Sequence, residues 1–239
     1  MIVAIDVGNS RLKWGVHHAG GWLDSGVLAT ADVAWLSEAA DEWPADSPVV
    51  ICNVAGAAVG ETLSTLLAPR HTRITFLHPS AAACGVRNSY DCPAQLGADR
   101  WAALIGARAM VAEACLVVSA GTATTIDLLD ADGLFRGGLI LPGFDLMRMA
   151  LANHTAQLPF VEGAFQREPR NTQDAIASGC LQAQLGAIER TYTIIAGQPG
   201  ARCLLTGGAA GRLVRHLKIP CQLVDNLILD GLARFAASP

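Results

Sequence analysis

The order of elements that the sequence predicts for the start of the chain recurs in its second half. Residues 1–5 are an apolar run rich in β-branched side chains, which is typical of a buried strand, and a polar turn with glycine and a return strand follow. Residues 116–129 have the same design, with glycine and threonine in the turn. In each half a third strand and a helix come later. This repeat predicts two similar lobes, covering residues 1–115 and 116–239.

The remaining apolar runs, with their glycine and proline breaks, predict the other elements. In the first lobe we expect strands over 22–28, 48–55 and 72–77 and helices over 32–43 and 59–67. In the second lobe we expect strands over 134–140, 202–206 and 220–225 and helices over 144–153, 174–196 and 227–237. The order β-β-β-α-β-α-β of the first lobe indicates a mixed sheet with antiparallel leading strands. The predicted fold class is α/β, and each lobe is expected to give one polar hairpin to a shared cleft.

Composition limits the possible partners and compartments. Charged residues make up 16% of the chain, against about 25% in an average soluble protein, and hydrophobic residues make up 51%, which indicates a core-rich protein. The net charge is -4 and there is no lysine or arginine run, so we expect neither nucleic acid nor a membrane as partner. No apolar stretch reaches the length of a transmembrane helix, and the N-terminus lacks the basic region of a signal peptide. The seven cysteines are scattered, which favours a reducing cytoplasm over a disulfide framework or a zinc site.

The first polar turn has the composition of a phosphate-binding loop. Its sequence, D-V-G-N-S-R-L-K over residues 6–13, combines a carboxylate, a glycine, small polar side chains and a lysine. Gly8 allows backbone N–H groups to approach a ligand closely, Lys13 supplies a positive charge, and Asp6 can face a magnesium ion. The same segment also suits a plain β-hairpin, since Asn-Ser is a common turn pair. A hairpin tip can present phosphate ligands, so the two interpretations are compatible.

Asp99 is a candidate for acid–base chemistry. It lies at or near the start of a helix predicted over residues 101–110. An aspartate in that position often caps the helix. Alternatively, Asp99 is a general base, with Arg100 beside it for an anionic substrate.

Two further segments of the second half have interpretations of their own. Asn171 or Thr172 is most simply the N-cap of the helix that follows. Gly207-Gly208, after a predicted strand, suits either a flat ligand lying on the backbone or close packing of a strand against a helix. The apolar stripe of the last predicted helix indicates a core or dimer face.

Three polar turns, each following a strand, occur in the order D-x-G-N-S-x-x-K, G-T-A-T-T-I-D and T-G-G-A-A. This ordered set resembles the two phosphate loops and the adenosine loop of the actin, sugar-kinase and Hsp70-like ATPases. Within that group the chain resembles the type III pantothenate kinases over nearly its whole length. The segments that carry the resemblance are residues 5–13, 97–100, 121–127 and 137–143, and the Gly-Ala-Asp-Arg turn at 97–100 is the most specific of them.

The resemblance implies a fold, a reaction and a set of site residues. The implied fold has two ribonuclease-H-like lobes, with helices on both faces of a mixed sheet, around a nucleotide cleft. The implied reaction is ATP-dependent phosphorylation of pantothenate to 4′-phosphopantothenate, the first step of coenzyme A biosynthesis, with Asp99 as the base that takes the proton of the attacking hydroxyl. The ATP phosphates would contact Asp6, Val7, Gly8, Asn9, Ser10, Arg11, Leu12, Lys13 and Thr122, with Mg²⁺ near Asp6. Pantothenate would lie against Tyr90, Gly97, Ala98, Asp99 and Arg100, with Thr172 nearby. The family is dimeric, with substrate near the subunit interface, so Thr172 is expected to act across it in a homodimer.

Position 119 departs from the family pattern. Many members carry a carboxylate two residues before the glycine of the second loop, where they bind a monovalent cation, but this chain has Ser119. A neutral hydroxyl is a poorer partner for K⁺ or NH₄⁺, although backbone carbonyls can still coordinate such an ion. We therefore expect no aspartate-based monovalent site. Asp127 lies nearby and either faces the nucleotide or is a strand-end carboxylate.

Two other functions are compatible with parts of this pattern. One is a non-catalytic accessory or regulatory role on the same fold, because a fold alone does not determine activity. The presence of Asp6, Lys13, Asp99 and Thr122 together favours an enzyme over that alternative. The other is a sugar or acetate-type kinase, but such chains are usually much longer, and this one lacks the insertions that would build a sugar pocket.

Overall fold

The computed structural model describes residues 1–155, 158, 160 and 162–238, and the chain divides into two compact units. Unit 1 contains Met1–Ala112, Gly133–Phe135 and the chain from Asn226 onward. Unit 2 contains Glu113–Asp132 and Arg136–Asp225.

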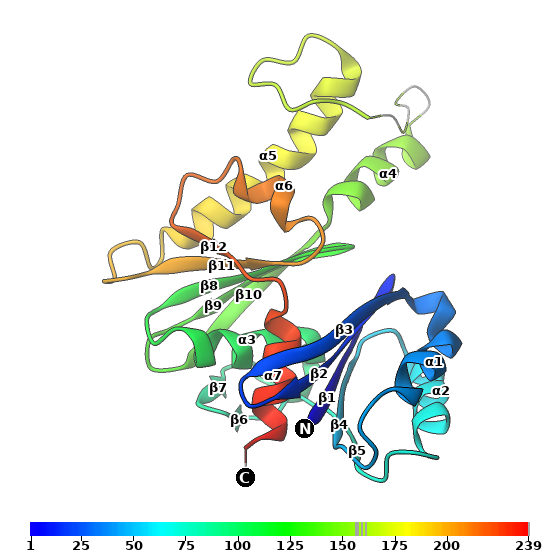
Figure 1. Cartoon of the computed structure of the whole chain (residues 1–239). Coiled ribbons are helices and arrows are strands. Elements are labelled where there is room, and N and C mark those ends of the chain that lie inside the picture. The colour runs from blue at the N-terminus through cyan, green and yellow to red at the C-terminus, as the bar shows by residue number, and fades with distance from the viewer. Residues whose placement is uncertain (156–157, 159, 161, 239) are drawn as a thin grey trace. The chain divides into compact units, whose positions relative to one another are not determined.

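Unit 1 is built on a five-stranded mixed sheet (Figure 1). The strands lie in the order β3-β2-β1-β4-β5. Pairing is antiparallel between β1 and β2 and between β2 and β3, and parallel along β1, β4 and β5. The three antiparallel leading strands and the mixed sheet are therefore confirmed. The bounds are β1 (Ile2–Val7), β2 (Arg11–His18), β3 (Gly21–Ala29), β4 (Val49–Asn53) and β5 (Ile74–Phe76).

Helices cover both faces of this sheet, and the alternation of side chains along β1 determines which residues face which layer. Val3, Ile5 and Val7 are fully buried in one apolar cluster with Leu36 and Leu63. That cluster contains residues of α1 (Leu36–Asp41) and α2 (Ala57–Leu67). The opposite face of the sheet packs against α3 (Ala98–Met110) and α7 (Leu227–Ala236). The helix predicted over 32–43 is in fact a 3₁₀ helix, η1 (Thr30–Trp35), followed by the short α1.

The last helix, α7, belongs to unit 1, so the predicted lobe of residues 116–239 is wrong at its C-terminal end. The helix packs against α3 at a point where both backbones carry glycine. A methyl group on Gly231 would overlap the carbonyl oxygen of Ala102, and one on Gly106 would overlap the carbonyl oxygen of Leu227. Trp22 of β3 also donates its indole N–H to Asp230 Oδ1 at 2.8 Å. Glycine at both positions of the crossing therefore permits backbone contact between helices that are far apart in the sequence.

A short region of unit 1 connects the sheet to α3. It contains β6 (Ala82–Ala83), β7 (Val86–Asn88) and the 3₁₀ helix η2 (Pro93–Gln95). Strand β7 pairs with the first two residues of β10, Leu134 and Phe135, in a parallel ladder. Phe135 is fully buried there, which places one residue from the middle of the chain next to the region that precedes Asp99.

Unit 2 repeats the strand order of unit 1. Its strands lie in the order β12-β11-β8-β9-β10, so the first strand of each unit has its own hairpin on one side and two later strands on the other. Pairing is antiparallel between β8 and β9 and parallel along β8, β11 and β12, as in unit 1. The prediction of two similar lobes is thus confirmed as a matter of topology. The bounds are β8 (Cys115–Ala120), β9 (Ala123–Leu129), β10 (Leu134–Pro142), β11 (Arg202–Thr206), β12 (Cys221–Leu223), α4 (Phe144–His154), α5 (Thr172–Tyr192) and α6 (Ala210–Val214).

Within the part of the chain that the structure describes, no helix combines the length and the apolar character needed to cross a bilayer.

Candidate active site

Asp6 lies near the end of β1, at the centre of the sheet of unit 1. Its direct neighbour on β2 is Lys13, and its neighbour on β4 is Cys52. The thiol of Cys52 hydrogen-bonds to the Asp6 carboxylate. Adjacent strands place these three side chains on the same face of the sheet, which is the face covered by α3 and α7. The position of Lys13 beside Asp6 is therefore a direct result of hairpin register.

The turn that joins β1 to β2 is tight, and hydrogen bonds from within it and from Thr30 hold its shape. The N–H of Gly8 donates to the carbonyl of Arg11 at 3.0 Å. Thr30 makes two hydrogen bonds to the turn. Its hydroxyl donates to the Gly8 carbonyl at 2.7 Å, and its N–H donates to the Ser10 carbonyl at 3.2 Å. Thr30 is buried, and it was not identified from the sequence, since it lies twenty-two positions after Gly8. These two hydrogen bonds fix the shape of the turn.

The predicted phosphate segment divides into two kinds of residue. Val7 and Leu12 are fully buried in the apolar core, so only their backbone can face a ligand. Asn9, Ser10 and Arg11 at the tip of the turn are exposed. The hairpin interpretation of this segment is therefore confirmed. Its tip is accessible, and phosphate binding there stays a prediction.

Asp99 occupies the first turn of α3, which begins at Ala98 with Gly97 as the preceding residue. Its Oδ1 accepts the N–H of Arg100 at 2.8 Å, but the N-cap of α3 is Gly97 and no side chain caps the helix, so Asp99 is not the cap that one interpretation predicted. The hydrogen bond uses one carboxylate oxygen as acceptor, and a carboxylate has acceptor capacity beyond it. A carboxylate bonded in this way can also serve as a proton acceptor.

Asp6 and Asp99 are close enough to interact electrostatically. Burial, together with the negative charge of Asp99, raises the pKa of Asp6 to about 7, while Lys13 and the Cys52 thiol oppose this rise. Asp6 is half-buried, and the protein atoms packed around its carboxylate keep most of the water away. Two carboxylates that lie close enough to repel each other favour a bound cation, because the cation stabilises the ionised form of both.

The residues present fit magnesium in a nucleotide complex better than a metal ion held by protein alone. Among the described residues there is no group of three or more histidine, cysteine, aspartate or glutamate side chains that could hold a metal ion. Magnesium in kinase sites is usually bound through one or two carboxylates plus substrate phosphates and water. The carboxylate of Asp6 matches that pattern.

The raised pKa of Asp6 gives a prediction for the ligand-free protein in EDTA. Between about pH 4 and pH 7 the folded protein keeps a proton on Asp6 that the unfolded chain releases, so this group makes stability fall as the pH rises through that window. Asp6→Asn is neutral at every pH and removes this contribution. The Tm of the variant relative to the wild type should therefore increase between about pH 4.5 and pH 8, as measured by thermal unfolding. A difference in Tm that is constant with pH would contradict the shifted pKa.

Arg100 is a buried arginine that fixes the position of Tyr90. Its guanidinium donates to the Tyr90 hydroxyl at 2.8 Å and lies 5.6 Å from the Tyr90 ring and 5.7 Å from the Phe135 ring. The rings of Tyr90 and Phe135 are 5.3 Å apart. The structure thus brings together the predicted substrate residues Tyr90, Asp99 and Arg100, and it adds Phe135, which sequence reasoning missed. Arg100, which the sequence suggested as a group for an anionic substrate, is 5% exposed and hydrogen-bonds to tyrosine.

The second glycine turn, in unit 2, is contacted by two other segments of that unit. Gly143 donates its N–H to the Thr122 carbonyl at 2.8 Å, and a side chain on Gly143 would overlap that turn. Gly207 has a φ of +97° and lies directly against Ala120, which leaves no space for a Cβ atom. Gly207 therefore packs against the end of the neighbouring strand β8 rather than against a helix, and ligand binding by the Gly207-Gly208 pair stays a prediction. Thr122 itself is exposed, as a phosphate contact would require.

Three other predicted positions lie in unit 2. Ser119 is half-buried on β8, next to Thr125 and Thr206 on the neighbouring strands. Asp127 is 1% exposed in the interior of β9, so it is not the strand-end carboxylate that the sequence suggested as one possibility. Thr172 is the exposed first residue of α5, and Asn171 is the N-cap, whose side chain accepts the N–H of Asp174 at 2.8 Å. Thr172 thus belongs to a different unit from the Tyr90, Asp99 and Arg100 group.

Comparison with known proteins gives consistent matches along the chain. A family model described as type III pantothenate kinase matches residues 2–193. The type III pantothenate kinase of Aromatoleum aromaticum is 57% identical over 233 residues, which cover 98% of this chain and 96% of that protein. Among solved structures, a protein from Campylobacter jejuni described as a Baf family transcriptional activator has a TM-score of 0.63 at 21% identity, covering 98% of this chain and 96% of that one. A Sinorhizobium meliloti protein described as a 2-dehydro-3-deoxygalactonokinase has a TM-score of 0.62 at 19% identity, covering 99% and 98%. The two structural matches support the predicted sugar-kinase-like fold.

Proposed function

Because this chain belongs to the type III pantothenate kinase family, we propose that it transfers the γ-phosphoryl group of ATP to pantothenate, giving 4′-phosphopantothenate at the entry of coenzyme A biosynthesis. Full-length identity of 57% to a protein of that name is the observation that carries the proposal. The acidic pair Asp6 and Asp99 beside Lys13 supports it from the structure. ATP is the phosphoryl donor, and a divalent metal accompanies it.

Asp99 is the proposed general base. It accepts the proton of the primary hydroxyl of pantothenate as that oxygen attacks the γ-phosphorus, and the bond from that phosphorus to the β–γ bridging oxygen breaks to release ADP. Phosphoryl transfer depends mainly on positioning and on neutralisation of charge, so a single base and fixed phosphate contacts suffice. Asp99 is attached to a helix N-terminus by its bond to the Arg100 N–H, which holds the accepting carboxylate in one place.

The proposed nucleotide contacts are the residue 6–13 turn and Thr122. Backbone N–H groups at the tip of the first turn and the Lys13 ammonium bind phosphate oxygens. Magnesium near Asp6 would neutralise charge on the phosphates. Lys13 already interacts with Asp6 across the hairpin, so it also favours the ionised form of Asp6 that binds a metal.

The proposed pantothenate contacts are Tyr90 and the turn Gly97–Arg100. Arg100 holds Tyr90 by a hydrogen bond and by stacking, so the tyrosine is preorganised for a substrate. Thr172 is proposed to contribute from the second subunit of a homodimer. The proposed compartment is the cytoplasm, where ATP is available and the seven cysteines, all free thiols in the structure, stay reduced.

A coupled ADP-release assay with purified protein tests the proposal. Reactions contain magnesium-ATP and pantothenate, with K⁺, with NH₄⁺, or with neither. We expect ADP release that depends on pantothenate, and a weak response to the monovalent ion because Ser119 replaces the usual carboxylate. Folded protein that binds ATP or pantothenate but gives no turnover in any of these buffers would support the accessory role instead.

A further inference from the structure

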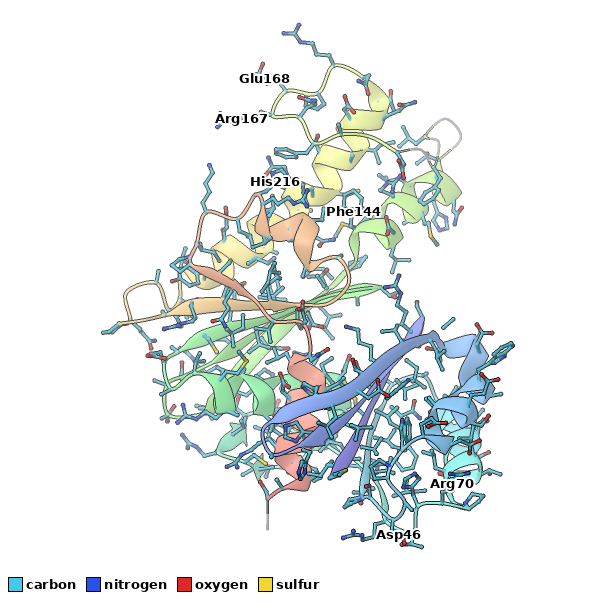
Figure 2. The ribbon with its side chains drawn as sticks, in the orientation of Figure 1. Asp46, Arg70, Phe144, Arg167, Glu168 and His216 are labelled. Atoms are coloured by element: carbon cyan, nitrogen blue, oxygen red, sulfur yellow. The ribbon has the colours of Figure 1, made fainter. Side chains whose placement is uncertain are left out.

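Two cysteines of unit 2 lie side by side on neighbouring strands. Cys203 on β11 and Cys221 on β12 are direct partners in the parallel ladder that joins these strands, which Figure 1 shows next to each other. The Cys203 thiol hydrogen-bonds to the Cys221 sulfur. The chain between the two residues runs through α6 and past His216, which Figure 2 labels. The fold therefore brings together two thiols from separate parts of the chain.

The backbone positions of this pair suit a disulfide bond. Neighbouring strands lie about 4.7–4.9 Å apart, and the Cα atoms of a disulfide are usually about 4.4–6.8 Å apart. Cys203 lies in the buried apolar cluster of unit 2 and Cys221 packs against that cluster, so both side chains project to the same face of the sheet. The N–H of Cys203 also donates to the Pro220 carbonyl at 2.8 Å, which holds the start of β12 against β11. A disulfide here would need rotation of side chains rather than a shift of the strands.

Cys115 on β8 is an alternative partner that the strand register disfavours. It pairs with Arg202, the residue before Cys203, so its side chain projects to the opposite face of the sheet. Cys115 is fully buried, and it lies outside the apolar cluster that contains Cys203. The geometry therefore selects Cys221 as the partner of Cys203.

The two thiols differ in access to solvent and in acidity. Cys203 is fully buried, whereas Cys221 is half-buried on a strand at the edge of the sheet. The hydrogen bond that it donates to Cys221, together with burial, raises the pKa of the Cys203 thiol. Accepting that bond lowers the pKa of the Cys221 thiol, although burial and the Glu189 carboxylate oppose the effect. The thiolate is the reactive form of cysteine, so Cys221 is the sulfur that reacts first.

Two side chains of α5 lie near the pair, and both are engaged in other hydrogen bonds. Tyr192 is buried near both sulfurs, and its hydroxyl donates to a backbone carbonyl at 2.7 Å. Glu189 lies near Cys221 and accepts the backbone N–H of Lys218 at 2.9 Å. These bonds hold the two side chains of α5 in place and leave the Cys203 thiol as the donor to Cys221.

Oxidation of such a pair by hydrogen peroxide is balanced in two steps. The Cys221 thiolate attacks one peroxide oxygen, the O–O bond breaks, and the hydroxide that leaves takes a proton from solvent to form water. Cys221 is then a sulfenic acid. The Cys203 sulfur attacks the Cys221 sulfur, and the hydroxide that leaves takes the Cys203 thiol proton to form a second water. The two sulfurs lose two electrons, and the peroxide gains them.

We propose that Cys203 and Cys221 are a thiol pair that hydrogen peroxide converts reversibly to a disulfide. Cys221 reacts with the peroxide, and Cys203 attacks the oxidised product. In a reducing compartment the pair is reduced at rest, and low-molecular-weight thiols restore it after oxidation. The proposal is independent of the kinase function, because none of the residues proposed for catalysis or substrate binding takes part.

Mapping of disulfides by mass spectrometry tests the proposal on the full chain. The reduced, folded protein is treated with hydrogen peroxide, its remaining thiols are blocked with iodoacetamide, and it is then digested with trypsin. Trypsin places each cysteine in its own peptide, residues 203–212 and 219–234, and neither peptide contains another cysteine. We expect these two peptides to be linked, with a mass lower by two hydrogens than their sum. Dithiothreitol added before the blocking step should abolish the linked species.

Single substitutions assign the two roles. Cys203→Ser should trap Cys221 as a sulfenic acid, which dimedone labels, because the thiol that would attack it is missing. Cys221→Ser should abolish both the disulfide and the dimedone label on this pair. Cys92→Ser is the matched control, because Cys92 is an exposed free cysteine of unit 1, and it should leave the disulfide unchanged. If a serine variant unfolds, as judged by circular dichroism, alanine at the same position repeats the test.

Three results would overturn the proposal. The first is a disulfide that joins Cys203 or Cys221 to a different cysteine, such as Cys115. The second is a pair that stays reduced in the folded wild type at a peroxide concentration that oxidises the exposed Cys92. The third is dimedone labelling of Cys203 in folded Cys221→Ser without labelling of Cys221 in folded Cys203→Ser.

Discussion

Asp99→Asn should fold as the wild type does and lose roughly two to four orders of magnitude in kcat. General-base catalysis contributes about 10²–10⁴-fold, and an amide cannot accept the proton of the attacking hydroxyl at neutral pH. Asparagine is nearly isosteric with aspartate, and its carbonyl oxygen can still accept the Arg100 N–H that now binds Oδ1 at 2.8 Å. The helix α3 should therefore keep its first turn. Steady-state kinetics of pantothenate phosphorylation, with thermal unfolding as a check on folding, measure the effect.

A second measurement separates loss of the base from general damage to the site. Removing the negative charge of Asp99 should lower the pKa of Asp6 from about 7, because that charge is one of the causes of the rise. Glu61→Gln, on the exposed face of α2, is the matched control and should leave kcat unchanged within about twofold. Substantial turnover by folded Asp99→Asn would remove Asp99 as the base.

Lys13→Ala should raise the KM for magnesium-ATP by roughly ten- to a hundredfold with a much smaller effect on the KM for pantothenate. A hydrogen bond to a charged group contributes about 1.5–3 kcal/mol, which corresponds to that range. The substitution also removes the positive charge that opposes the raised pKa of Asp6. The rise in the KM for magnesium-ATP should therefore be greater at pH 6 than at pH 8, because Asp6 is more fully protonated at pH 6.

Lys13→Arg keeps the positive charge at the same place in the hairpin and should recover part of the lost affinity for ATP. Recovery by arginine distinguishes a charge effect from a packing effect of the lysine stem. A KM for pantothenate that rises more than the KM for ATP would mean that the residue 6–13 turn binds the acceptor instead.

Local patterns in the sequence predicted a large part of this fold. The turn between β1 and β2, the position of Asp99 in the first turn of α3 and the N-cap at Asn171 all depend on neighbouring residues, and the structure confirms them. The repeat of strand order in the two units was also predictable, because each hairpin has its own turn signal.

Features that depend on distant residues were not predictable in this way. The helix α7 packs in unit 1 because glycines at 106 and 231 allow backbone contact, and nothing near residue 231 indicates its partner. Phe135 contacts Tyr90 from a strand that mostly belongs to unit 2. Thr30 supports the first turn from the start of η1, just after β3.

The candidate site shows the same division. Residue types identified Asp6, Lys13 and Asp99, because carboxylates and a lysine are the groups that phosphate chemistry uses. Their electrostatic coupling, which raises the pKa of Asp6, depends on the distance between β1 and the start of α3 and is visible only in the fold.

The most direct test of the proposed reaction is to identify the product by ³¹P NMR and mass spectrometry after incubating the protein with magnesium-ATP and pantothenate. We expect a phosphomonoester on the primary hydroxyl of pantothenate, formed in equal amount to ADP, and a reaction at least about a hundredfold slower with Asp99→Asn. Release of ADP and inorganic phosphate with unmodified pantothenate would contradict it, because the protein would then be an ATPase.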